Sequence, residues 1–346
     1  MFRILSLAGG GLRGAYAIGF LCALEERLDG SLSDYFDLIA GASTGGITSS
    51  ALAYGISAQE MQLFYEKHGT DIFNPRPEMK VSLIGQAFYP LIRRIVRKKT
   101  NQNIDNFFRS RYCPNGLEEA MQEGFGNDTL SDVKKCRLII PAVNLSKGIT
   151  CVFRTPHLPT QREEYNWKIS DVILSATAAP TYFPHKTMPN GNSYVDGALW
   201  ANDPSLVAMA ETARILRCED GQCSNQSHGI SFDSSRIQML SIGAGKNAHS
   251  LSPPDDEAGV LYWSKNVIEV MNLLQLQGAQ FPLKVALGDR YHHYDFEILD
   301  KSWKLDNIDM IDQLFEMGKS DGAKQYEALK ETFFTKKTQP YEQLGL

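Results

Sequence analysis

The sequence lacks any long apolar run. Its 346 residues are 43% hydrophobic, yet no window holds the roughly 18 uninterrupted apolar residues of a membrane-spanning helix. Residues 1–7 also lack the charged stretch, apolar stretch and small-residue cleavage site of a secretory signal. We therefore expect a cytoplasmic protein whose contact with a membrane is peripheral.

Positive charge is also scarce. The chain has 35 Lys and Arg against 40 Asp and Glu, for a net charge of -5, and its pI is near 5.9. Broad binding to a nucleic-acid polymer depends on neutralising many phosphates, so this composition argues against it. The length is sufficient for one large α/β domain or for one domain that carries insertions.

Cysteines are few and follow no disulfide-framework spacing. We expect most of them to be reduced, small core residues; the six are Cys22, Cys113, Cys136, Cys151, Cys218 and Cys223. For the last two, which are separated by four residues, a surface loop is favoured, and a regulatory disulfide or a metal site are the alternatives. A structural zinc would need further ligands that the neighbourhood does not clearly supply. We expect neither a metal nor a cofactor.

What the sequence does contain is a repeated strand, turn and helix. Residues 3–8 form a short apolar run that ends in three glycines, and residues 12–28 carry apolar side chains at helical spacing. Residues 36–40 form a second run, which again ends in a glycine-rich turn, before a helical segment at 46–54. Two such consecutive units predict a parallel sheet with right-handed crossovers.

The rest of the chain continues this α/β organisation. We expect further strands at 137–143, 150–154, 193–195 and 236–242, and further helices at 57–68, 169–178, 204–216, 259–276 and 308–333. Residues 73–132 interrupt the rhythm and are expected to form a cap insertion over one edge of the sheet, and residues 221–235 a loop. The predicted division is an α/β domain over 1–245 and a C-terminal helical region over 246–346 that packs on the same domain.

The first glycine turn fits more than one function. Residues 9–14 read Gly-Gly-Gly-Leu-Arg-Gly, which matches G-x-G-x-x-G after a strand. A dinucleotide site would also need an acidic residue at the end of the second strand, where residues 40–43 read Ala-Gly-Ala-Ser. That site and a purely structural turn remain minor alternatives. We favour unobstructed N–H groups of Gly9, Gly10 and Gly11 that stabilise an oxyanion.

Residues 41–45 read Gly-Ala-Ser-Thr-Gly and match G-x-S-x-G where a strand turns into a helix. The small residues Gly41 and Gly45 permit a sharp turn, so we expect the Ser43 hydroxyl to be exposed at the carboxyl edge of the sheet. If the strands before Gly9 and Ser43 are neighbours, about 4.8 Å apart, the glycine amides face the serine. We therefore interpret Ser43 as a nucleophile.

Arg13 lies at the start of the first helix, beside the glycine turn. It could orient that turn or hold a phosphate, and a surface salt bridge is an equal alternative.

No histidine lies in a context that indicates catalysis. The candidates are His68, His157, His185, His228, His249, His292 and His293. The last two are adjacent, so on a strand they would point to opposite faces. Asp196 instead ends a short predicted strand and is followed by Gly197 and Ala198, which open a turn. We interpret Asp196 as the base that accepts the proton of Ser43, with a helix-capping aspartate as the structural alternative.

Four segments together resemble the ordered signatures of the patatin-like phospholipases: Gly-Gly-Gly-Leu-Arg-Gly at 9–14, Gly-Ala-Ser-Thr-Gly-Gly at 41–46, Ser-Ala-Thr-Ala-Ala-Pro-Thr-Tyr-Phe-Pro at 175–184, and Asp-Gly-Ala at 196–198. The resemblance reaches from residue 3 to about 245. It implies a three-layer α/β sandwich with a mainly parallel central sheet, and a Ser43–Asp196 dyad without histidine. Ala8 and Ala198 depart from common family residues, which leaves the substrate range open.

By this resemblance the protein is a lipid acyl hydrolase of the phospholipase A type, with Gly9, Gly10 and Gly11 as the oxyanion hole. An α/β-hydrolase with a Ser–Asp–His triad is disfavoured, because its elbow normally follows several strands. A non-enzymatic lipid-binding or storage protein is the alternative from another class, and the presence of both Ser43 and Asp196 speaks against it.

The C-terminal part resembles, more loosely, the tail of bacterial patatin-like effectors that cyclic oligonucleotides switch on in antiphage defence; the segments are 287–291 and 303–307. Our hypothesis is that such a nucleotide binds across a homodimer interface and orders the active site. An unregulated housekeeping lipase is the alternative.

Residues 81–99 carry apolar side chains at helical intervals and then the basic residues Arg93, Arg94, Arg97, Lys98 and Lys99. This segment is a candidate for membrane contact and for gating an acyl groove. A cap helix with a solvated basic face is the alternative.

Overall fold

The computed structural model describes residues 1–77, 94, 109–223, 233–247, 259–298 and 303–344. A central sheet runs in the order β5-β6-β3-β2-β1-β7-β9, with β4 paired to β3, and β8 pairs with β10 in a separate small sheet. The strands are β1 (Phe2–Leu7), β2 (Leu38–Gly41), β3 (Arg137–Asn144), β4 (Ile149–Arg154), β5 (Lys186–Thr187), β6 (Ser193–Asp196), β7 (Ile237–Ile242), β8 (Lys246–Asn247), β9 (Tyr291–Tyr294) and β10 (Glu297–Ile298).

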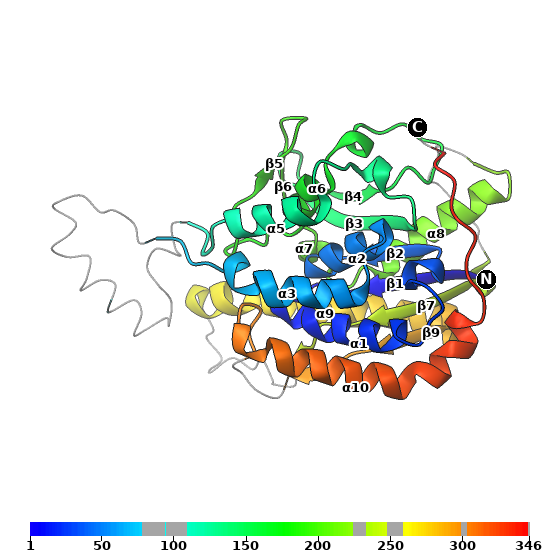
Figure 1. The fold of residues 1–346 in the computed structure, drawn as a ribbon. Coiled ribbons are helices and arrows are strands. Elements are labelled where there is room, and N and C mark those ends of the chain that lie inside the picture. The colour runs from blue at the N-terminus through cyan, green and yellow to red at the C-terminus, as the bar shows by residue number, and fades with distance from the viewer. Residues whose placement is uncertain (78–93, 95–108, 224–232, 248–258, 299–302, 345–346) are drawn as a thin grey trace.

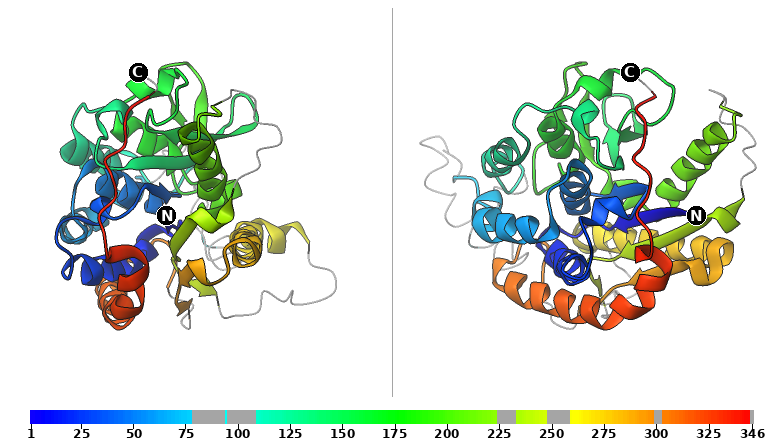
Figure 2. Two further views of the ribbon diagram at one scale, coloured as in Figure 1. Left: turned by 90° about the vertical axis from the view of Figure 1, so that its right-hand side faces the viewer. Right: turned by 45° about the vertical axis from the view of Figure 1, so that its right-hand side comes forward.

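Helices lie on both sides of this sheet (Figures 1 and 2). The α-helices are α1 (Ala15–Glu25), α2 (Thr44–Tyr54), α3 (Ala58–Ile72), α5 (Asn115–Phe125), α6 (Ile169–Ala176), α7 (Ala198–Ala201), α8 (Ser205–Glu219), α9 (Val260–Leu287) and α10 (Ile311–Leu329). Short 3-10 turns are η1 (Gly11–Gly14), η2 (Leu32–Asp34), η4 (Leu130–Asp132), η5 (Glu163–Asn166), η6 (Ser234–Arg236), η7 (Gly288–Arg290) and η8 (Ile308–Met310), and a π turn, η9, spans Lys330–Phe334.

The middle of the sheet is parallel. Strand β1 is parallel to β2 and β7, β2 is parallel to β3, and β7 is parallel to β9. Strands β4 and β6 run antiparallel to β3, and β5 runs antiparallel to β6. The predicted three-layer α/β architecture with a mainly parallel sheet is therefore confirmed, and the antiparallel strands lie together at one side.

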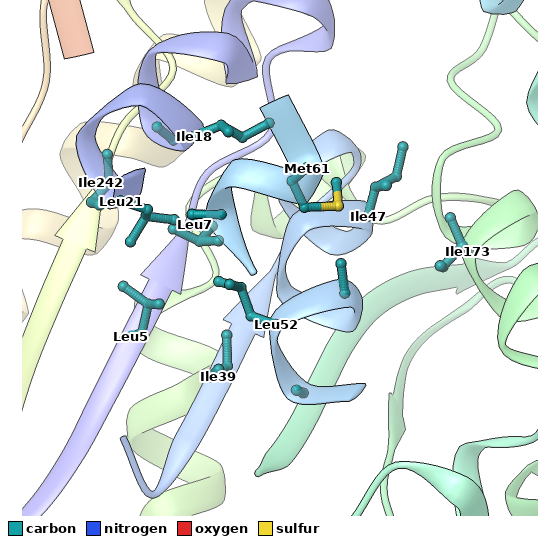
Figure 3. Close-up of a cluster of buried hydrophobic side chains, with 14 of the residues drawn as sticks. Leu5, Leu7, Ile18, Leu21, Ile39, Ile47, Leu52, Met61, Ile173 and Ile242 are labelled. Carbon is teal, nitrogen blue, oxygen red and sulfur yellow. The ribbon is translucent and has the colours of Figure 1, made fainter. Parts of the chain in front are cut away.

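Successive residues of β1 enter different cores. Ile4 packs in a cluster with α8 and the last turns of α9, whereas Leu5 and Leu7 pack with α1 and α2. Figure 3 shows the second cluster, in which Leu21 of α1 and Leu52 of α2 lie over the sheet. Because both faces are buried, apolar residues on β1 point to both sides of the sheet, and the strand does not alternate between apolar and polar residues.

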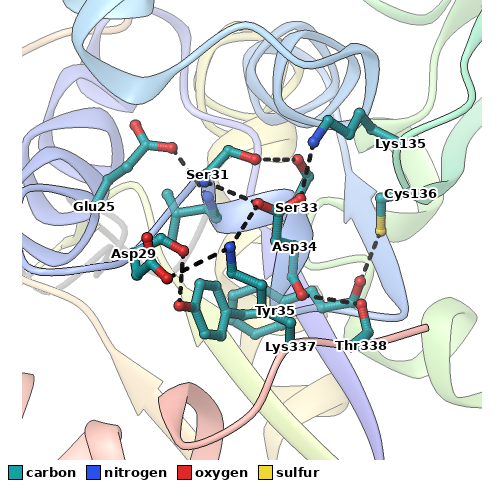
Figure 4. Close-up of polar contacts among 12 residues, drawn as sticks. Glu25, Asp29, Ser31, Ser33, Asp34, Tyr35, Lys135, Cys136, Lys337 and Thr338 are labelled. Atoms are coloured by element: carbon teal, nitrogen blue, oxygen red, sulfur yellow. Dashed lines mark hydrogen bonds and ion pairs between the residues drawn. The ribbon is translucent and has the colours of Figure 1, made fainter. Parts of the chain in front are cut away.

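The segment after α10 packs beside η2, the turn that precedes β2. Thr338 donates to the Asp34 carbonyl through its N–H at 2.7 Å and through Oγ1 at 3.1 Å. The carboxylate of Asp34 in turn accepts from Lys135 Nζ at 2.9 Å (Figure 4). These contacts fix the loop that leads into β2, the strand before Ser43.

Several predicted boundaries were wrong. The helix expected at 12–28 begins with the tight η1 turn, and α1 ends at Glu25. Helix α9 continues through Pro282 to Leu287, beyond the predicted end at 276, because Leu283 and Leu287 are buried against the body of the protein. The sequence analysis missed β9, whose residues Tyr-His-His-Tyr have no apolar pattern, and α5.

Other predictions lie wholly or partly outside the described residues. Of the predicted cap, α5 packs against α3 and α6. Residues 78–93 and 95–108, which include most of the basic segment, and most of the 221–235 loop are not among the described residues.

Four of the six cysteines are free, as expected, and the other two form a disulfide. Cys22 and Cys136 are buried and Cys113 and Cys151 half-buried, and all four are free. Cys218, in the last turn of α8, forms a disulfide with Cys223, so the disulfide alternative holds for this pair. Within the described part of the chain, no cluster of side chains is suited to a metal ion, and no described helix combines the length and apolar character needed to cross a bilayer.

Candidate active site

The glycine turn and the serine turn leave the sheet side by side. Leu7 of β1 pairs with Gly41 of β2, so Gly9 and Ser43, each two residues further on, emerge at the same edge. A Cβ atom added to Gly9 would lie 3.0 Å from the Ser43 Cβ atom. The expectation that these two strands are neighbours is confirmed.

Asp196 reaches this edge from an antiparallel strand. Ala40 of β2 pairs with Ile139 of β3, and Ala142, three residues further along β3, pairs with Asp196 of β6. Ser43 is likewise three residues beyond Ala40, so the serine and the aspartate reach the same level. The Ser43 Oγ atom donates a hydrogen bond to Asp196 Oδ2 at 2.6 Å.

The backbone of Ser43 is strained. Its φ of 51° and ψ of -124° lie in a region that residues other than glycine rarely adopt. Gly41 and Gly45 allow the turn to close, since a Cβ at 41 would lie 2.0 Å from the Gly45 carbonyl oxygen and a Cβ at 45 would lie 2.3 Å from the Leu7 carbonyl oxygen. Gly197 is similarly constrained, because its Cβ would lie 2.1 Å from the Pro141 carbonyl oxygen.

The expected exposure of Ser43 was wrong. Ser43 is only 8% exposed and Asp196 1% exposed, because the Gly9 turn and the Asn202 side chain pack against the elbow. Ser43 instead lines the floor of an open pocket with about 960 Å³ of empty space, adjoining solvent included. The apolar lining of this pocket includes Leu12, Ile47, Tyr65, Ile72, Phe73, Leu117, Tyr182, Phe183, Leu199 and Leu305.

The carboxyl group of Asp196 loses its proton less readily in its buried surroundings than it would in water. Burial raises the pKa of Asp196 to about 6, although hydrogen bonds from the Ser43 hydroxyl and the Ala198 N–H oppose the shift. The Ala198 bond, to Oδ1, measures 2.8 Å. At neutral pH the carboxylate is charged, and its pKa is close enough to the working pH to accept a proton from a hydroxyl.

The three turn glycines are not equivalent. The Gly9 N–H donates to the Asn202 carbonyl at 2.9 Å, and the Gly10 N–H makes a long bond to Thr44 Oγ1 at 3.3 Å. For the Gly11 N–H, the described residues provide no acceptor. Gly10 and Gly11 are therefore better placed than Gly9 to donate to an oxyanion.

Arg13 contacts the same turn. Its Nε atom donates to the Gly10 carbonyl oxygen at 3.4 Å. Three roles were considered for Arg13, and this contact supports the one in which it orients the glycine turn.

Histidine is absent from the described lining of the pocket. His157 is buried between Thr155 and Glu211. The adjacent residues of β9 point to opposite faces as expected: the His292 ring packs on Phe333, and His293 hydrogen-bonds to Gln280 and Ser241. His228 and His249 lie outside the described residues.

Two pocket residues were missed by the sequence analysis. Asn202 holds Gly9 through its backbone carbonyl, and a weak signal for it existed, since it lies six residues after Asp196 and directly before Asp203 and Pro204. Leu305 covers the glycine turn, where its carbonyl accepts the Leu12 N–H at 2.8 Å. The resemblance at 303–307 marked this segment but not its contact with the glycine turn, because Leu12 is almost three hundred residues away from Leu305 in the sequence.

The serine lies on a strand-to-helix elbow and is paired with a carboxylate beside a glycine turn. This is the geometry of a serine hydrolase with an α/β fold. The sequence profile of the family described as "Patatin-like phospholipase" matches residues 5–209. The chain belongs to the patatin-like phospholipase family.

Three relatives share the name "cGAMP-activated phospholipase". The protein from Vibrio cholerae is 34% identical over 259 residues, which cover 72% of this chain and 66% of the relative. That from Escherichia coli is 33% identical and covers 72% and 64%, and that from Pseudomonas aeruginosa is 29% identical and covers 87% and 79%. The chain thus spans just under two-thirds of the length of the first two.

Proposed function

We propose that this protein hydrolyses acyl ester bonds of membrane glycerophospholipids through Ser43 and Asp196. The observation that carries the proposal is the 2.6 Å hydrogen bond from Ser43 Oγ to Asp196 Oδ2 at the floor of an apolar pocket. A hydroxyl bonded to a carboxylate can transfer its proton as it attacks a carbonyl. Apolar walls suit an acyl chain, which would place the ester carbon near the hydroxyl.

The reaction would proceed through an acyl-enzyme. Ser43 Oγ attacks the ester carbon while its proton passes to Asp196, and the tetrahedral oxyanion accepts hydrogen bonds from the Gly10 and Gly11 N–H groups. Collapse breaks the bond to the leaving alcohol, which takes the proton from Asp196. Water then attacks the acyl carbon with Asp196 again as the base, and this step releases the fatty acid and restores Ser43.

We further propose that a cyclic oligonucleotide activates the enzyme and that the protein acts in the cytoplasm at the membrane surface, in antiphage defence. The names of the three relatives support a nucleotide activator. The engaged Gly9 N–H also supports a resting state in which one of the three turn glycines is not available to an oxyanion.

The test is fatty-acid release from phospholipid vesicles, with and without 3′,3′-cGAMP. We expect release by the unaltered chain in the presence of cGAMP, and loss of nearly all of it in Ser43→Ala and Asp196→Asn, each of which should retain the unaltered circular-dichroism spectrum. Ser50→Ala is the matched control, because Ser50 is buried in α2, the helix that follows Ser43, and its hydroxyl donates to the Gly46 carbonyl.

Two outcomes would each reject one part of the proposal, the nucleotide activation or the catalytic dyad. Equal release without nucleotide would reject activation and favour an unregulated lipase. Release by Ser43→Ala at the unaltered rate would reject the dyad.

A further inference from the structure

Helix α9 carries apolar side chains on two opposite sides. One side, which includes Leu276, Ala279, Leu283 and Leu287, is buried against the body of the protein. The other side exposes large apolar residues: Trp263, Val267, Met271, Leu274, Phe281 and Val285. We call these six residues the α9 seam. Two of them, Phe281 and Val285, are 73% and 74% exposed, and a helix that is apolar all round is normally buried on all sides.

The spacing of the seam is that of a helix that packs on another helix. Its members follow at steps of four, four, three, seven and four residues, and Gly278 divides the step of seven into four and three. Alternating steps of three and four keep a narrow seam on one side of a helix, as in coiled coils. Gly278, with no atom near its Cβ position, allows close approach.

The seam is also symmetric about Leu274, apart from Met271, whose counterpart is Gln277. Trp263 and Val285 each lie eleven residues from Leu274, and Val267 and Phe281 each lie seven residues from it. An antiparallel copy of the same helix would therefore place Trp263 against Val285, Val267 against Phe281, and Leu274 against its own counterpart. Such self-complementarity is the requirement of a two-fold interface between identical chains.

We propose that α9 packs antiparallel on α9 of a second copy of this chain, with the two-fold axis at Leu274. From Trp263 to Val285 the seam is about 33 Å long. A standard interface of about 800 Å² per partner is roughly 28 Å across, so the seam is long enough to form the centre of a stable dimer.

A lipid surface fits the seam less well. Helices that lie on anionic membranes combine a wide apolar face with a basic face. Among the α9 side chains that the structure describes, Lys284 is the exposed basic residue, and the exposed polar neighbour Gln277 is neutral. A narrow apolar seam therefore matches a helix partner better than it matches a lipid surface.

The proposed interface lies next to the candidate active site. Gln275, beside Leu274, accepts the Asn202 N–H at 2.8 Å and donates to the Leu199 carbonyl at 3.0 Å. The Asn202 carbonyl in turn accepts the Gly9 N–H. Any effect of dimer formation on catalysis rests on the proposed function, whereas the interface itself does not.

The mass of the full chain in solution tests the interface without any substrate. We expect the mass of two chains by light scattering, and of one chain for Leu274→Glu, which would place two charges together on the axis. Leu63→Glu is the matched control, since Leu63 is 63% exposed on α3, and it should remain dimeric. A monomeric unaltered chain, with and without cGAMP, would overturn the proposal.

Cysteine crosslinking tests the orientation. Under oxidation Leu274→Cys should crosslink to itself, and a mixture of Val267→Cys and Phe281→Cys should crosslink, while Val267→Cys alone should behave as the unaltered chain. Self-crosslinking of Val267→Cys would mean a parallel pair and overturn the proposal. A monomer whose binding to phosphatidylcholine vesicles is lost in Leu274→Glu but kept in Leu63→Glu would identify the seam as a lipid contact instead.

Discussion

Asp196 receives two hydrogen bonds, one from the Ser43 hydroxyl to Oδ2 at 2.6 Å and one from the Ala198 N–H to Oδ1 at 2.8 Å. Neither donor carries a charge. Burial therefore dominates the titration of this carboxyl and raises its pKa to about 6.

The first prediction follows from this pKa. In the proposed mechanism the charged form of Asp196 accepts the serine proton, so kcat/KM should increase about tenfold per pH unit below pH 6 and level off above it. The assay is hydrolysis of a soluble short-chain ester across pH 4.5 to 8. A profile that is flat across pH 6 would contradict the role of Asp196.

The predicted fall in kcat/KM below pH 6 should not be caused by unfolding. Because the folded pKa of Asp196 lies above its ordinary value of 3.8, its contribution to stability is fully present below about pH 4 and is lost as the pH rises through about 6. Protonation of Asp196 thus stabilises the fold where activity falls, and thermal unfolding at each pH is the control.

The second prediction concerns the elbow glycines. Gly45→Ala would place a Cβ atom 2.3 Å from the Leu7 carbonyl oxygen, so the backbone must move; we expect a stability loss of about 1–3 kcal/mol together with loss of ester hydrolysis. Gly14→Ala is the matched change, because its Cβ would meet the nearest atom at 3.4 Å and helical alanine is favoured by about 0.5–1 kcal/mol. Urea unfolding measures both. Equal stability of the two variants would contradict the assigned packing.

The third prediction concerns a buried ion cluster away from the pocket. Burial raises the pKa of Glu211, but the hydrogen bond with His157 and the charges of Arg154 and Arg214 outweigh burial and lower it to about 2. Glu211→Gln leaves the buried Arg154 without its counter-charge, so we expect a loss of about 3–5 kcal/mol in urea unfolding. Glu219→Gln, on the same helix but in a surface pair with Arg137, should cost no more than about 1 kcal/mol.

The fourth prediction tests the contact between α9 and the glycine turn. Gln275→Ala removes both hydrogen bonds that hold the 199–202 segment, each worth about 1 kcal/mol. With Asn202 loosened, Gly9 and its turn should shift, and kcat should fall several-fold with little change in KM. Gln277→Ala, exposed on the same helix, should leave both constants unchanged; a matching fall there would contradict a specific role for Gln275.

The parts of the site that sequence reasoning found are those encoded locally. A strand, a glycine turn and a helix occur twice within the first 54 residues, and right-handed crossovers between such units put β1 beside β2. The register between them then places Gly9 next to Ser43. Asp196 could be found because small residues follow it at the end of a short strand.

The remaining features depend on distant contacts. The exposure of Ser43 was overestimated because the Asn202 side chain closes on Gly9, and no periodicity encodes that approach. The end of α9 was placed too early because Gly278 and Pro282 both weaken a helix. Packing of Leu283 and Leu287 beyond them supplies the stabilisation that local propensity lacks.

The bond between Leu12 and Leu305 has a consequence for protein synthesis. One wall of the pocket comes from a segment that leaves the ribosome last among the pocket residues. A nascent chain, or a fragment terminated before residue 305, would therefore carry the elbow and its carboxylate with the glycine turn uncovered on that side. Such incomplete products should be poor catalysts, so the order of synthesis delays a complete pocket until the last part of the chain has emerged.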